Sequence, residues 1–248
     1  MKGRTEMGID YTKRAPQPPA ASAGTDGSAP AGGVSGGGVS LSKVRLTKAA
    51  PTVSLAKHGS GGMLRVNLNW NARPPAKGGG LFKRLTAALD TQAIDLDLGC
   101  LWEFTDGSKG VVQALGNSFT AAPKGVGEPV IWLDGDDRSG TNSAGENLFV
   151  NLAHVTSIRR ILVFAFIYEG VPNWAAADGV VTLFPVSGPQ IEVLLDEPRN
   201  GARSCAIAML TSDGAELSVR REVNYVDGSQ SALDSAYQWG LRWAPGHK

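Results

Sequence analysis

One short stretch of the sequence concentrates side chains that can do chemistry. Four acidic residues fall within residues 134–146, separated mostly by Gly, Ser and Thr. Carboxylates this close repel one another unless a cation or arginine side chains neutralise them. The glycines let the backbone fold back, so that carboxylate and carbonyl oxygens can converge on one point. This pattern favours a hard cation with many oxygen ligands, above all Ca²⁺, and the alternative is a solvated acidic hairpin loop.

A second acidic pair, Asp95 and Asp97, lies upstream in the motif Asp-Leu-Asp-Leu. Residues two apart on a strand point to the same face, so Leu96 and Leu98 then face the core. Two carboxylates on one face of a half-buried strand need a partner, or else they lie in water near Arg138. Only the fold can bring the two acidic groups together. The candidate metal ligands are Asp95, Asp97, Asp134, Asp136, Asp137, Glu146 and Asn147.

The acidic stretch does not have the spacing of an EF-hand. A twelve-residue frame that starts at Asp134 places Arg138 at position 5, where a ligand is required, and Gly140 at position 7 instead of 6. No helical periodicity flanks the stretch. Any calcium ion is therefore expected to bind to loops at the end of a β-sheet.

Alternation of apolar and polar residues predicts strands around these acidic groups. Val39-Ser-Leu-Ser-Lys43 recurs as Val53-Ser-Leu-Ala-Lys57, and residues 63–70 alternate in the same way. The dipeptides Asp106-Gly107 and Asp213-Gly214 are typical of hairpin turns. Many short strands with almost no helical stretch predict an all-β fold, a two-sheet β-sandwich of about ten strands with short helical turns.

Composition divides the chain into two parts. Residues 1–38 are rich in Pro, Ala, Gly and Ser and offer little apolar bulk, so we expect a disordered N-terminal tail. Residues 39–248 form the expected sandwich domain. Within it, residues 81–89 and 232–237 are the segments with helical character.

The motifs occur in an order that is more specific than any one of them. The series is Gly38–Lys43, a strand ending in Asn69-Trp70-Asn71, Asp95-Leu-Asp97 and Gly135–Gly140. It resembles the TerD-domain family of tellurium-resistance and stress proteins, and residues 95–106 and 115–119 are most similar to TerA-type members. Over residues 38–243, the resemblance implies a calcium-binding β-sandwich with no established catalytic activity.

The sequence departs from the family at one position of interest. The family commonly carries a run of three acidic residues after its glycine–aspartate motif, whereas this chain reads Gly145-Glu146-Asn147. One carboxylate remains where three are usual. The resemblance therefore implies that one metal site is weaker or absent.

The net charge of +1 argues against a dedicated nucleic-acid binder, but the charge is unevenly distributed. Residues 39–89 carry nine Lys or Arg and no Asp or Glu. Such asymmetry predicts a basic surface that meets anionic lipid or an acidic protein. The alternative is that these side chains are spread over several faces of the sandwich.

Cysteine and tryptophan residues offer little further chemistry. Cys100 and Cys205 are the two cysteines, both in apolar segments where a thiol behaves as a small hydrophobe. We expect Trp70, Trp102 and Trp132 in the core. Trp174 follows Pro172-Asn173 and is expected to be exposed in a loop.

Targeting signals are not evident in the sequence. The N-terminus has no apolar region typical of a secretory signal, and the longest apolar run, residues 161–167, is too short to span a bilayer. We expect a cytoplasmic protein, or one peripheral at the inner membrane face.

Together with the resemblance, these observations lead to an expected function. It is a calcium-binding, non-enzymatic stress-response protein associated with tellurite resistance. Its expected partners are other tellurium-resistance and stress proteins or an anionic membrane surface, and not nucleic acid. The alternative function is that of a hydrolase that uses the acidic cluster for acid/base chemistry.

Overall fold

The computed structural model describes residues 43–55, 61–71, 94–135, 145–170, 173–199, 201–214 and 216–244. All of them belong to one compact unit, Ser40–Lys248. The expected tail over residues 1–38 and the expected helical segment 81–89 lie outside the described residues. Within the described part of the chain, no helix is long and apolar enough to cross a membrane.

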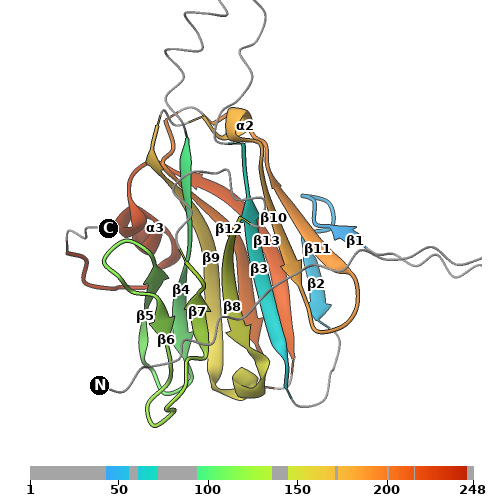
Figure 1. Cartoon of the computed structure of the whole chain (residues 1–248), viewed down its shortest axis with the longest axis vertical. Coiled ribbons are helices and arrows are strands. Elements are labelled where there is room, and N and C mark those ends of the chain that lie inside the picture. Colours follow the sequence, from blue (N-terminus) through green and yellow to red (C-terminus); the bar gives the residue numbers. More distant parts are fainter. Residues whose placement is uncertain are drawn as a thin grey trace, which may run out of the picture. The chain divides into compact units, whose positions relative to one another are not determined.

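Two β-sheets share one apolar core and form a β-sandwich, as the sequence predicts (Figure 1). The seven-stranded sheet A has the order β1-β11-β10-β3-β8-β7-β6, and the six-stranded sheet B has the order β2-β13-β12-β9-β4-β5. The strands are β1 (Lys43–Arg45), β2 (Thr52–Leu55), β3 (Met63–Asn69), β4 (Asp95–Phe104), β5 (Lys109–Gln113), β6 (Thr120–Ala121), β7 (Ile131–Leu133), β8 (Glu146–Asn151), β9 (Ile158–Glu169), β10 (Gly179–Phe184), β11 (Gln190–Leu195), β12 (Ser204–Ser212) and β13 (Leu217–Val226).

The hairpin turns and one of the helical turns lie where the sequence predicts them. Gly107 and Gly214 adopt left-handed backbone angles in the connections β4–β5 and β12–β13. The helix α3 (Gln230–Tyr237) covers the segment predicted to be helical near the C-terminus. A 3-10 helix, η1 (Leu152–Ser157), and a one-turn helix, α2 (Trp174–Ala177), complete the described elements.

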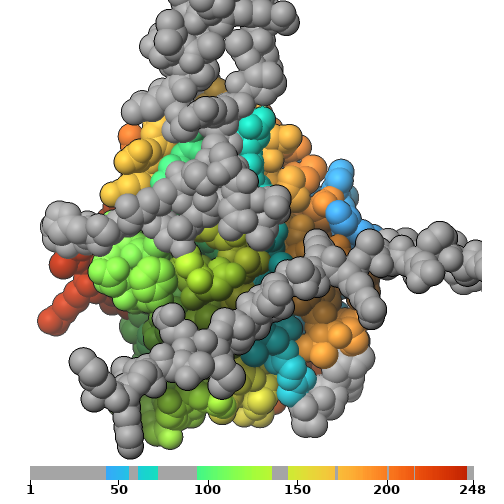
Figure 2. All heavy atoms as spheres, in the orientation of Figure 1, coloured from blue at the N-terminus to red at the C-terminus, as the bar shows by residue number. Residues whose placement is uncertain are grey.

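Alternation along the strands places apolar side chains between the sheets. In β3, Leu64, Val66 and Leu68 are fully buried and contribute to the same core as Leu96 and Leu98 of β4. Each buried aliphatic side chain of this size contributes about 1.5–3 kcal/mol by removal from water. Figure 2 shows the outer surface of the molecule in the same orientation as Figure 1, and these core side chains lie beneath that surface.

The other face of sheet B carries a second apolar cluster. Leu101 of β4 and Phe164 of β9 alternate with core residues and pack instead against Leu233 of α3 and Trp239, which follows α3. All four side chains are fully buried. The C-terminal segment is therefore part of the folded domain, because it covers apolar surface that sheet B would otherwise expose.

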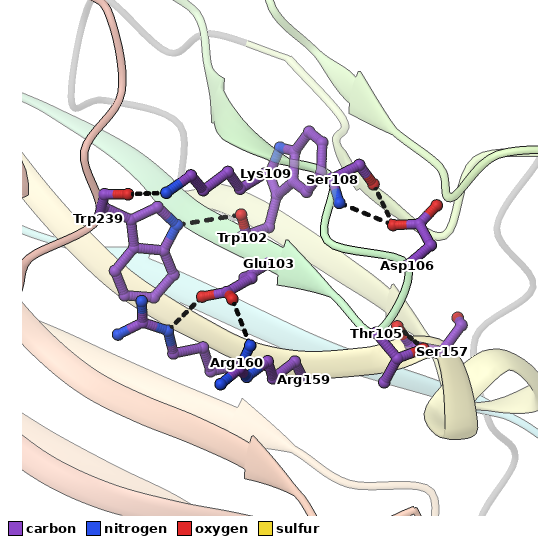
Figure 3. A network of polar contacts seen from close by, with 10 residues as sticks. All are labelled: Trp102, Glu103, Thr105, Asp106, Ser108, Lys109, Ser157, Arg159, Arg160 and Trp239. Carbon is purple, nitrogen blue, oxygen red and sulfur yellow. Dashed lines mark hydrogen bonds and ion pairs between the residues drawn. The ribbon is translucent and has the colours of Figure 1, made fainter.

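Polar contacts also connect this C-terminal segment to sheet B (Figure 3). The indole Nε1 of Trp239 donates to the carbonyl of Trp102 at 3.0 Å, and Lys109 Nζ donates to the carbonyl of Trp239. The guanidinium of Arg160 lies 3.8 Å from the centre of the Trp239 ring, and its Nε donates to Glu103 at 2.6 Å. Glu103 thus holds the guanidinium of Arg160 over the ring of Trp239. The cation–π attraction stabilises this position of the indole in addition to its burial.

Candidate functional site

The carboxylate of Glu146 connects the two sheets at one end of the sandwich. Glu146 is the first residue of β8 in sheet A, and its Oε2 accepts a hydrogen bond of 2.6 Å from the backbone N–H of Leu98 in sheet B. The last pair between β4 and β5 is Gly99 with Gln113, so Leu98 lies just beyond the paired part of β5. The carboxylate of Glu146 therefore accepts the hydrogen bond of the Leu98 N–H, a buried donor that β5 does not reach.

Asp95 and Asp97 begin β4 next to this contact. Their exposed fractions are 7% and 0%, and that of Glu146 is 2%. The prediction that Leu96 and Leu98 face the core is confirmed, since both are fully buried. The expectation of a half-buried strand is wrong at this end, because the aspartates on the other face are also buried. Glu146 therefore contacts the backbone of Leu98, and Asp97 is the preceding residue of β4.

Asp134 and Asn147 form a separate polar group. Asn147 donates to the Asp134 carboxylate from its backbone N (3.2 Å) and from its side-chain Nδ2 (2.8 Å). Successive residues of a strand point to opposite faces, so Asn147 turns away from the side on which Glu146 reaches β4. Asn67 of β3 donates to Asn147 Oδ1 at 2.9 Å. The structure therefore divides the described candidate ligands between the two sides of β8.

Asp136 and Asp137, the remaining candidates, lie outside the described residues. Among the described residues, no group of three His, Cys, Asp or Glu side chains is placed so that it can hold a metal ion. The donors that are present, Asp95, Asp97 and Glu146, are all oxygen ligands. Their chemistry fits a hard cation such as Ca²⁺ and does not fit a metal that prefers sulfur or nitrogen.

Two residues of the site were not among the sequence candidates. Asn67 is buried and bonds to Asn147, and the alternating amides Asn67 and Asn69 of β3 were the available signal. Gly145 has a φ of +62°, and a Cβ atom there would lie 2.2 Å from the carbonyl oxygen of Leu68. Only glycine fits at this point, which sets the path of the chain into Glu146.

Trp174 is buried, and the expectation that it is exposed is wrong. Its side chain is fully buried, its Nε1 donates to the carbonyl of Ala202 at 2.8 Å, and its ring packs edge-on against Tyr225. The dipeptide Pro172-Asn173 predicts a loop, but it carries no information about packing against residues that are distant in the sequence. Cys100 and Cys205 are buried as expected, and burial raises the pKa of both thiols, so neither is a reactive thiolate.

Acidic residues of β11 and of the connection that follows it neutralise part of the basic stretch. Lys43 and Arg45 of β1 pair with Glu192 of β11 at 2.8 and 2.6 Å, because the two strands are parallel neighbours. Both cations hold the pKa of Glu192 below its usual value. Lys48 pairs with Glu197 at 2.9 Å. The asymmetry along the sequence is therefore smaller in space than the sequence predicts, as far as the described residues show.

A known tellurium-resistance protein is similar to most of this chain. Tellurium resistance protein TerA of an Alcaligenes species is 45% identical over 212 residues, which is 85% of this chain and 60% of that protein. The chain is similar to this tellurium-resistance protein over most of its own length. The resemblance drawn from the motifs is thus confirmed, and the chain spans about three fifths of the length of TerA.

The chain was also compared with protein-family models and with solved structures. No family model matches the chain. The crystal structure of a homologue of telluride resistance protein (TerD) from Streptomyces coelicolor A3(2) is similar with a TM-score of 0.48 and 20% identity, over 70% of this chain and 94% of that one.

The tight backbone at Gly145 leads to a prediction for stability. Gly145→Ala places a Cβ against Leu68 O, whereas Gly107→Ala, also at positive φ, meets no atom within 4 Å. Gly107→Ala should cost about 1–2 kcal/mol for the left-handed backbone alone. Gly145→Ala should cost about 1–3 kcal/mol more, because the backbone must also shift. Urea unfolding of both variants measures the difference, and equal losses would contradict the close contact.

Proposed function

We propose that this chain binds calcium at the end of the sandwich where Asp95, Asp97 and Glu146 are buried, and that it serves in tellurium resistance by binding and not by catalysis. The observation that carries the proposal is the near-complete burial of three carboxylates from two facing sheets. An ionised carboxylate is costly to bury, and a divalent cation beside it offsets that cost. An all-oxygen donor set is the one that Ca²⁺ prefers.

The division of the ligands by β8 supports two ion positions. Glu146 extends toward β4, and Asn147 extends to Asp134 on the other side. We propose that Asp95, Asp97 and Glu146 contribute to one ion position, and that the carboxylate of Asp134 contributes to a second. Asn147 positions Asp134 through its donated hydrogen bonds, because its own Oδ1 already accepts from Asn67 and Arg65. Calcium takes six to eight ligands, so each position needs more oxygens. The sequence offers Asp136 and Asp137 for this purpose.

Calcium should raise the thermal stability of the wild-type protein. An ion that binds the native state alone adds about 2.7 kcal/mol at a hundredfold excess over its dissociation constant. For a domain of this size, that corresponds to a rise in Tm of about 5–10 °C between chelator and calcium. Asp97→Asn should abolish most of this rise. The Asn side chain is close to Asp in size, so the substitution removes the ligand charge and changes the packing little.

Asp196→Asn is the matched control for this experiment, since Asp196 is exposed and lies outside the acidic cluster. Its calcium response should equal that of wild type. Differential scanning calorimetry in chelator and in calcium measures all three proteins. A wild-type Tm that is the same in both conditions would refute a structural calcium site. A calcium response that survives Asp97→Asn would place the ion elsewhere.

We further propose that the functional partner is another protein of the tellurium-resistance response. Lys43, Arg45 and Lys48 already pair with acidic residues of the chain, so lipid phosphates would have to displace those pairs. The tagged full chain should capture such a protein in calcium, less of it in chelator, and little with the Asp97→Asn variant. In a parallel arm, anionic vesicles should sediment no more of the chain than neutral ones. Sedimentation with anionic vesicles only, and no protein captured, would assign the partner to the membrane.

A further inference from the structure

A hollow of about 570 Å³ lies where α3 begins, between β5 and the residues that follow α3. In Figure 1, α3 lies beside β5 at this edge of the domain. The volume is within the range of pockets that hold small organic molecules, roughly 300–1,000 Å³. None of the acidic candidate ligands lines it. The hollow is therefore a separate feature from the proposed calcium positions.

Buried amides line the inner part of this hollow. Gln113 of β5 and Gln230 of α3 are each 6% exposed, and Gln230 Nε2 donates to Gln113 Oε1 at 3.2 Å. Gln113 Nε2 in turn donates to the carbonyl of Leu115 at 3.0 Å. This chain of hydrogen bonds joins the helix to sheet B. The lining is thus held in place by the fold before any ligand arrives.

The charged side chain in the lining of the hollow is basic. Arg242 is the one charged residue of its lining, it is exposed, and it has no ion-pair partner among the described residues. The first turn of α3 holds no acidic residue, and its N-cap, Ser229, makes no side-chain capping bond. The hydroxyls of Ser229 and Ser231 lie 2.9 Å apart at the same helix start. The start of a helix, two hydroxyls and a guanidinium together attract an oxyanion.

An apolar wall faces the same space. Val111, Leu115 and Trp243 belong to the lining. The indole of Trp243 is oriented by its Nε1, which donates to Asp234 at 2.9 Å. Asp234 is itself buried and also accepts from the backbone N–H of Leu241. The aromatic side chain is therefore positioned before binding, with an apolar surface for the body of a ligand.

We propose that this hollow binds a small organic anion. Its oxyanion group, a phosphate or a carboxylate, lies at the start of α3 with Ser231 and Arg242, and its apolar body lies against Trp243. A small organic anion would occupy more of the 570 Å³ than a bare inorganic oxyanion would. The absence of acidic residues from the lining decides against a cation.

The test compares four probes by isothermal titration calorimetry on the full chain. Phenyl phosphate and benzoate carry both charge and apolar body, inorganic phosphate lacks the body, and phenol lacks the charge. At least one of the first two should bind about tenfold or more tightly than the last two. Which of them binds identifies phosphate or carboxylate as the recognised group. No binding of either up to millimolar concentration, or equal binding of inorganic phosphate, would overturn the proposal.

Variants locate the binding within the hollow. Arg242→Gln should weaken the preferred probe about tenfold or more. Arg199→Gln should leave it unchanged, because Arg199 is also exposed but lies in the connection between β11 and β12. Ser231→Glu should abolish binding while Tm stays the same or rises, since a carboxylate in the first turn of a helix is stabilising. Wild-type affinity in both Arg242→Gln and Ser231→Glu would show that the probe binds elsewhere.

Discussion

The hydrogen bond from Leu98 N–H to the carboxylate of Glu146 is the contact on which the acidic end of the sandwich depends. It spans from sheet A to sheet B at a position that the partner strand β5 does not reach. Its donor, Leu98, directly follows Asp97 in β4. Only glycine at position 145 allows the chain to pass the carbonyl oxygen of Leu68 before it enters β8 at Glu146. The position of Asn147 on the other side of β8 then follows from strand geometry.

The C-terminal segment gives the domain its second organising feature. Sheet B is apolar on both faces, and α3 with Trp239 covers the face that does not meet sheet A. Trp239 is held there by its indole N–H, by its carbonyl and by the guanidinium of Arg160 (Figure 3). Because the segment begins beside the end of β5, the covering is incomplete at the start of α3. The hollow with Arg242 is a consequence of that arrangement.

Strands and turns were predictable because their signals are local. The alternation of β3, the Asp-Gly turns and the closing helix are all visible in short windows of sequence. The short strand β6 has two residues and cannot show periodicity, which is one reason why the thirteen described strands exceed the expected ten.

Contacts between distant segments were not predictable in this way. The burial of Trp174 depends on Ala202 and Tyr225. The neutralisation of Lys43 and Arg45 depends on the parallel pairing of β1 with β11. For the candidate site, residue types and spacing identified the carboxylates. The sheet register was needed to show that Glu146 reaches β4 and that Asn147 extends to Asp134.

The central claim, an ion held beside Asp95 and Asp97, can be tested directly by terbium luminescence. Tb³⁺ binds to calcium sites and emits when a nearby tryptophan transfers energy to it. Trp70 is suited to this role, because its Nε1 donates at 3.0 Å to the carbonyl of Ile94, the residue before Asp95. The account predicts sensitised emission that calcium displaces, that Trp70→Phe reduces and that Asp97→Asn abolishes. Emission that is absent from wild type, or that is unchanged in Asp97→Asn, would contradict it.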